Sequence, residues 1–244
     1  MQLLVKFFLL FLFTCFTVFG QSKDSDWSKI KSLPLIRVLK LSLPSNASFS
    51  ESIDGSVYFI DSTLINKVNS PLPNDSLALN YTYNFINNYL SVAGELVLKN
   101  IIHSSNGKEE IESESDSGHT VIFEVLYNGL KLNNYYGYIY LSGQNIKKAY
   151  LKLPSKIEPI SESVREIISK EKAISIFEEQ TEKAFKQKYE ADNIELVYNW
   201  YVIDNIQNGL DFSKPVLRPN WLITFGGGSE ILVDAFDGKL WRDD

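Results

Sequence analysis

Three consecutive glycines near the C-terminus, Gly226 to Gly228, separate two segments of alternating apolar residues. The alternating positions are Trp221, Ile223 and Phe225 before the glycines, and Ile231, Val233 and Ala235 after them. A phosphate-binding loop needs a helix after its glycines, because the amides of the first helical turn face the anion. Here the following segment has the two-residue period of a strand. The glycines are therefore predicted to form a hairpin turn between two strands, not a nucleotide site.

Similar hairpin patterns occur upstream. Val121, Phe123 and Val125 alternate before Asn128-Gly129, a pair that tolerates the positive φ angles of a tight turn. A second alternating run carries Tyr136, Tyr138 and Tyr140 and ends at Ser142-Gly143. Residues 96–153 are therefore predicted to form an antiparallel sheet.

Two segments have the spacing of helices. Leu77, Tyr81, Phe85 and Tyr89 recur at four-residue steps, and Gly94 is predicted to end that helix. A second amphipathic helix is predicted after Ser169, a capping residue, with its apolar face at Ala173, Phe177, Ala184, Phe185 and Tyr189. The predicted fold class is α+β, with two consecutive modules, 35–160 and 161–244, each an antiparallel sheet packed by one helix.

The N-terminal residues 1–20 have the pattern of a targeting segment. Lys6 precedes an uncharged, mainly apolar run from Phe7 to Phe19, which is typical of a secretory signal peptide. An uncleaved membrane anchor and lipid attachment at Cys15 are the alternatives. Each places the rest of the chain, beginning with a linker over 21–34, outside the cytoplasm. Cys15 is the one cysteine, so the chain beyond this segment is predicted to have no disulfide.

Charge and residue types limit the possible functions. With 24 basic and 30 acidic residues the net charge is −6, which argues against nucleic acid as a partner. His103 and His119 flank the acidic loop 104–118, and a metal site is conceivable there if their strands pair. The alternative, which the lack of a known ligand spacing favours, is a solvated hairpin loop. We therefore expect no catalytic residue, no cofactor, no bound metal and no enzyme activity.

Two stretches resemble a known family of regulators. "ISKEKAISIFEEQTEKAF" with "PNWLITFGGGSEILVDAFDGKLW" resembles a PepSY-type module, and "HTVIFEVLYNGLKLNNYYGYIYLSGQNIKKAYLKL" resembles the module that precedes it in thermolysin-family propeptides. Together they resemble the extracytoplasmic part of the YycH/YycI regulators of a cell-wall sensor kinase. "DWSKIKS", residues 26–32, is similar to the opening of YycI proteins, although there that stretch precedes the membrane helix and here it follows the apolar segment.

The resemblance implies a non-catalytic extracytoplasmic regulatory protein that acts by binding a protein. The implied partner is the sensor kinase or a paralogous regulator, with membrane contact only through the N-terminal segment. The alternative is a propeptide-like inhibitor or chaperone of a secreted protease.

Two groups of residues are predicted to contact the partner. The first comprises the aromatic residues Tyr135, Tyr136, Trp200 and Tyr201, because tyrosine and tryptophan are favoured in interfaces. The second comprises Ile231 and Val233, on a strand predicted to lie at an open sheet edge that could accept a partner strand. The alternatives are that the aromatic residues cover a second packed face, and that the N-terminal module or the tail "WRDD" covers the edge.

Overall fold

The computed structural model describes residues 27–41, 49–52, 56–60, 74–104, 118–200, 207 and 214–241. The predicted signal segment, residues 21–26 of the predicted linker, the acidic loop 105–117, Tyr201 and residues 242–244 lie outside these ranges. Among the described residues, no helix is long and apolar enough to cross a membrane.

Strands make up most of the described chain. In chain order the elements are a short 3-10 helix η1 (Trp27–Lys29), β1 (Ser32–Lys40), β2 (Phe49–Glu51), β3 (Val57–Ile60), α2 (Asp75–Tyr89), β4 (Glu95–Ser104), β5 (Gly118–Tyr127), β6 (Leu130–Ser142), β7 (Asn145–Lys152), β8 (Pro154–Glu166), α3 (Lys170–Phe185), β9 (Ala191–Trp200), β10 (Val216–Phe225), β11 (Ser229–Asp234) and β12 (Leu240–Trp241).

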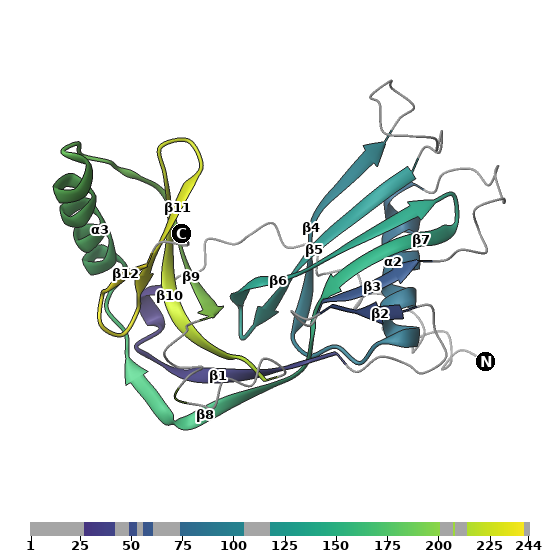
Figure 1. Ribbon diagram of the computed structural model, residues 1–244, viewed down its shortest axis with the longest axis horizontal. Helices are drawn as coiled ribbons and strands as arrows, with labels where there is room; N and C mark the ends of the chain where they lie inside the picture. Colours follow the sequence, from purple (N-terminus) through teal and green to yellow (C-terminus); the bar gives the residue numbers. More distant parts are fainter. Residues whose placement is uncertain are drawn as a thin grey trace, which may run out of the picture.

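All of these strands belong to one mixed sheet of twelve strands (Figure 1). Its main path runs β12-β11-β10-β9-β6-β7-β3-β2, with β5 and β4 continuing from β6, and β1 and β8 continuing from β10. The two halves meet where β6 and β9 pair in parallel, at Lys131 with Val197 and Leu132 with Tyr198. The prediction of two separate antiparallel sheets, each packed by a helix, is therefore wrong.

Strand β1 extends the sheet from β10 to β8. It pairs with β8 along most of its length and with the start of β10 at Ile36–Leu217 and Arg37–Val216. Figure 1 shows β1 and β8 running side by side beneath both halves of the sheet. The expected module boundary between residues 160 and 161 falls inside β8.

Strand β8 was missed in the sequence because it contains Pro154 and Pro159. Proline donates no backbone hydrogen bond and is tolerated at a strand start or on an edge strand. Among the described residues β8 pairs only with β1, so both positions are compatible with the sheet.

The turns confirm the hairpin predictions. Asn128 and Gly129 have φ angles of 51° and 77° and connect β5 to β6. Gly226, Gly227 and Gly228 have φ angles of 56°, 81° and 122° and connect β10 to β11. Three successive left-handed residues would strain any side chain with a Cβ, which is the physical reason for three glycines.

Helix α2 packs on one face of the half of the sheet that contains β5 and β7. Asn74 caps it by accepting a hydrogen bond from the Leu77 amide at 2.9 Å. The buried positions are Ala78, Leu79, Thr82, Phe85 and Ile86, whereas Leu77 and Tyr89 are exposed. Four-residue steps turn by 400° on an α-helix, so the predicted line of residues drifts away from the core face.

Helix α3 packs against β10 and β11 in the other half. Ser169 caps its first turn by accepting from the Lys172 amide at 3.2 Å, as predicted. Ala173, Phe177 and Thr181 are its buried residues, and the Thr181 hydroxyl donates to the Phe177 carbonyl at 2.8 Å. The predicted apolar face ends there, because Ala184 and Phe185 are exposed.

A buried ion pair closes the core of this half. The Arg218 guanidinium contacts the Asp234 carboxylate through Nε and also through Nη2, which lies 3.2 Å from Oδ1. The same Oδ1 accepts from the backbone amides of Phe236 at 2.7 Å and Asp237 at 3.1 Å. Asp234 is fully buried. The segment "VDAFDG" is therefore a turn organised by a buried carboxylate, and its other acid, Asp237, is exposed on the turn.

Replacing Asp234 by Ala is expected to lower the free energy of unfolding by about 3–5 kcal/mol, because the buried Arg218 charge loses its main partner. Asp237→Ala is the matched control: its carboxylate also lies near Arg218, at 3.6 Å, but its side chain is 40% exposed. We expect that change to cost less than about 1 kcal/mol. Chemical denaturation of the two variants measures the difference. Equal losses of free energy in the two variants would show that the buried ion pair contributes no more to stability than the exposed one.

Candidate functional site

The face of the sheet opposite α2 carries a cluster of tyrosines on β3, β6 and β7. Along β6, Gly137, Ile139 and Leu141 are buried, so the alternate residues Tyr136 and Tyr138 point to the other face. Tyr138 lies directly opposite Tyr150 of β7, which lies opposite Tyr58 of β3. We call Tyr58, Tyr136, Tyr138 and Tyr150 the tyrosine face.

The rings of the tyrosine face contact one another. Ring centroids are 5.0 Å apart for Tyr58 and Tyr150, 5.2 Å for Tyr136 and Tyr138, and 5.7 Å for Tyr136 and Tyr150. The Tyr150 hydroxyl also lies 2.8 Å from the hydroxyl of the buried Ser56. Tyr58 and Tyr138 nevertheless remain 41% exposed. The result is an ordered aromatic surface that solvent reaches.

Lysines surround this surface. Lys152 pairs with Tyr136 and Lys148 pairs with Tyr140, one strand away. Glu124, opposite Tyr136 on β5, contacts Lys99 at 2.7 Å and Lys131 at 2.9 Å. Burial alone would raise the pKa of Glu124, but hydrogen bonds from the two lysines outweigh it and hold that pKa below its ordinary value. Among the described residues, four lysines therefore lie around Glu124 at this surface, and the pKa of Lys99 is raised mainly by its hydrogen bond to Glu124 and further by a second carboxylate, that of Glu230.

The structure separates the aromatic residues predicted to bind a partner. Tyr136 belongs to the tyrosine face, but its neighbour Tyr135 is buried in the core, where burial strongly raises its pKa. Trp200 is half-buried at the end of β9 and makes no ring contact with the tyrosine face among the described residues. Tyr201 lies outside the described residues. Period-two alternation explains the difference between Tyr135 and Tyr136, because neighbours on a strand face opposite ways.

The predicted open edge at β11 is partly occupied. Strand β12 pairs with it at Leu232–Trp241 and Val233–Leu240. The side chains of Ile231 and Val233 are buried in the core. These two residues therefore belong to the hydrophobic core. At Leu232 and Val233 the C-terminal segment covers the edge of β11, which was the alternative to an open edge.

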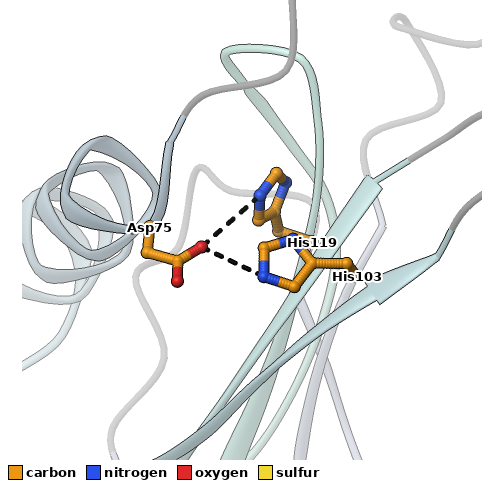
Figure 2. A group of neighbouring side chains, drawn as sticks. All are labelled: Asp75, His103 and His119. Carbon is orange, nitrogen blue, oxygen red and sulfur yellow. Dashed lines mark ion pairs between the residues drawn. The ribbon is translucent and has the colours of Figure 1, made fainter.

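A second group of polar side chains lies on the other face of the sheet, beneath the start of α2. His103 of β4 and His119 of β5 are directly opposite each other in the ladder, with ring centroids 4.5 Å apart. Asp75, the first residue of α2, points at both rings (Figure 2). Its Oδ1 lies 3.2 Å from Nε2 of His103 and 3.8 Å from Nε2 of His119.

The two histidines differ in environment. The His119 side chain is only 5% exposed, whereas those of His103 and Asp75 are more than half exposed. Burial is the main cause that lowers the pKa of His119 below its ordinary value; the nearby His103 imidazole adds to this, and Asp75 acts in the opposite direction. Nδ1 of His119 is buried without a hydrogen-bond partner among the described residues.

Sequence reasoning recognised only part of this group. The strands of His103 and His119 pair, which was the condition set for the two imidazoles to approach. Asp75 was missed, since it lies in a turn-like segment and only the packing of α2 on the sheet brings it to the histidines. The acidic loop between the two strands lies outside the described residues.

Comparison with known proteins adds information on the fold. No protein-family model matches the chain, and no curated protein matches it. Among solved structures, an uncharacterized protein from Eubacterium rectale ATCC 33656 is similar, with a TM-score of 0.53 and 9% sequence identity. The match covers 88% of this chain and 86% of that one. At this identity the likeness shows a shared fold and carries no statement about function.

The environment of His119 predicts how stability depends on pH. Because its pKa is lower in the folded chain, the unfolded chain binds more protons just below the ordinary value of 6.5. The contribution of neutral His119 to the free energy of unfolding is therefore fully present above pH 6.5. It is lost as the pH falls from 6.5 toward the lower pKa that His119 has in the folded chain. We expect the free energy of unfolding, measured in a buffer with a chelator, to fall more steeply from pH 7.5 to 5 in the wild type than in His119→Asn. Equal slopes in the two proteins would contradict this.

Proposed function

We propose that this chain is a non-catalytic extracytoplasmic regulatory protein that binds a protein partner through the tyrosine face. The observation that carries the proposal is the cluster of four contacting tyrosines, two of them 41% exposed, on an ordered sheet. Tyrosine supplies a large contact area and a hydrogen-bonding hydroxyl at a low cost in side-chain entropy. Such residues recur at the centres of protein interfaces.

The structure around the tyrosine face favours a preformed interface. Ring contacts and the Ser56–Tyr150 hydroxyl contact hold the side chains in place before any partner binds. Little conformational freedom is then lost on association, which improves affinity. The surrounding lysines favour a partner that presents acidic side chains around an apolar or aromatic centre, because complementary charge speeds association and rejects other partners.

The class of partner follows from the sequence resemblance. The resemblance of these stretches to YycH/YycI regulators supports a sensor kinase or a paralogous regulator as the protein bound, and the apolar segment 7–19 supports a location outside the cytoplasm. A secreted protease is the competing partner, and identification of the bound protein distinguishes the two.

A photo-cross-linking amino acid at position 138, introduced into the full chain in the native envelope, tests the proposal. We expect a specific adduct with a membrane sensor kinase or a paralogous regulator, identified by mass spectrometry. Position 89 is the matched control, because Tyr89 is 51% exposed on α2, on the opposite face of the sheet. Adding Tyr58→Ser to the cross-linking chain is expected to reduce the adduct at least about fivefold, the loss that corresponds to an interface residue worth more than about 1 kcal/mol.

Two results would contradict this surface. One is equal cross-linking from positions 138 and 89; the other is an adduct that survives Tyr58→Ser in a variant with wild-type thermal unfolding. If the adduct contains a secreted protease, the tyrosine face stands as the binding surface, but the proposed class of partner is wrong.

A further inference from the structure

We propose that Asp75, His103 and His119 form a binding site for a divalent transition-metal ion of the zinc type. The three residues offer one carboxylate oxygen and two imidazole nitrogens, which are ligand types common at zinc sites. Their ligand atoms all lie within 4.8 Å of one another. This site is separate from the proposed function, because it lies on the α2 side of the sheet and the tyrosine face lies on the other.

The distances fit a metal ion between the three side chains. Zinc bonds of about 2.0–2.2 Å place neighbouring ligands of a tetrahedron about 3.4 Å apart. The carboxylate of Asp75 lies 3.2 Å from His103 Nε2 and 3.8 Å from His119 Nε2, close to that separation. The side chains of His103 and Asp75 are more than half exposed and can therefore rotate to adjust these distances, whereas the His119 side chain is buried.

The geometry of His119 leaves one of its nitrogens open toward the other two residues. Its side chain is almost fully buried, and its Nε2 faces Asp75 at 3.8 Å, which is too long for a hydrogen bond. Its other nitrogen, Nδ1, has no partner among the described residues. Nε2 is therefore the nitrogen that faces the cluster without a hydrogen bond to Asp75, and it is the atom that a metal ion would take.

The backbone holds the two histidines in position. His103 and His119 face each other across paired strands, so their Cβ atoms are close without any change in the fold. Asp75 comes from the first turn of α2, whose amide dipoles by themselves disfavour a cation, and its negative charge offsets that effect. Three protein ligands leave one position of the tetrahedron for water or for a ligand from another molecule.

The site connects α2 to the β4–β5 hairpin. Among the described residues, β4 pairs only with β5 and so forms an edge of the sheet. A metal shared between β4, β5 and the first residue of α2 would hold that edge against the helix. Metal binding should therefore raise the thermal stability of the folded chain, because the unfolded chain does not preform the site.

Titration of the full chain with zinc ion, after treatment with a chelator and dialysis, tests the site. We expect one equivalent of zinc to bind and to shift the imidazole NMR signals of both histidines. The chain has only two histidines, so these signals are unambiguous. Zinc should also raise the melting temperature of the wild type.

Two variants and two controls complete the experiment. His103→Ala and Asp75→Asn change exposed side chains, and each is expected to weaken zinc binding at least about tenfold, since even outer partners of metal ligands have effects of that size. Glu171→Gln is the matched control, because Glu171 is an exposed acid in the first turn of α3. Tyr138→Ser is the control for independence from the tyrosine face. Both controls should bind zinc as the wild type does.

Two outcomes would overturn the proposal. The first is a wild-type chain that binds no zinc. The second is zinc binding that persists in His103→Ala and shifts neither imidazole signal, which would place the ion on carboxylates elsewhere. Either outcome leaves the partner proposal unaffected, because that proposal is tested separately by cross-linking at position 138.

Discussion

The pairing of β6 with β9 is the contact on which the architecture depends. Among the described residues it consists of two residue pairs, Lys131 with Val197 and Leu132 with Tyr198, yet it turns two groups of strands into one sheet. A strand edge leaves amides and carbonyls unpaired, and closing one edge against another satisfies both. Strand β1 extends the β10 side of this sheet, because it pairs with β10 at Ile36 and Arg37 and with β8 along most of its length. The earliest described strand thus connects with the last third of the chain.

Within that frame, the half of the sheet that carries α2 has two surfaces with different chemistry. One surface is covered by α2 and carries the group of Asp75, His103 and His119 at the start of that helix. The other surface carries the tyrosine face and its lysines. A strand produces this division directly, because successive residues point to opposite sides. Tyr138 and Ile139 are neighbours in the chain, but Tyr138 is 41% exposed and Ile139 is fully buried.

The other half is organised by buried polar groups as well as by apolar packing. Asp234 neutralises Arg218 and at the same time accepts two backbone amides of its own turn. The Phe236 ring covers the guanidinium, with 4.9 Å between the ring centroid and Arg218 Cζ. A carboxylate with so many partners is stable in the core, and a motif that resembles a ligand-binding loop is explained by the fold alone.

The local structure followed from the local sequence, because φ preferences and side-chain period act between near neighbours. Asn128-Gly129 and Gly226–Gly228 determined two turns, and Ser169 determined the start of a helix. The alternation of apolar residues determined the strands on either side of these turns. The assembly did not follow. Contacts between residues distant in the chain join the two halves and hold β8 with its two prolines in the sheet. Such contacts also bury Tyr135, Ile231 and Val233 and bring Asp75 to the two histidines. Pairing of strand edges and packing of a helix on a sheet add up over many residues, and only the tertiary structure decides which edges and faces meet.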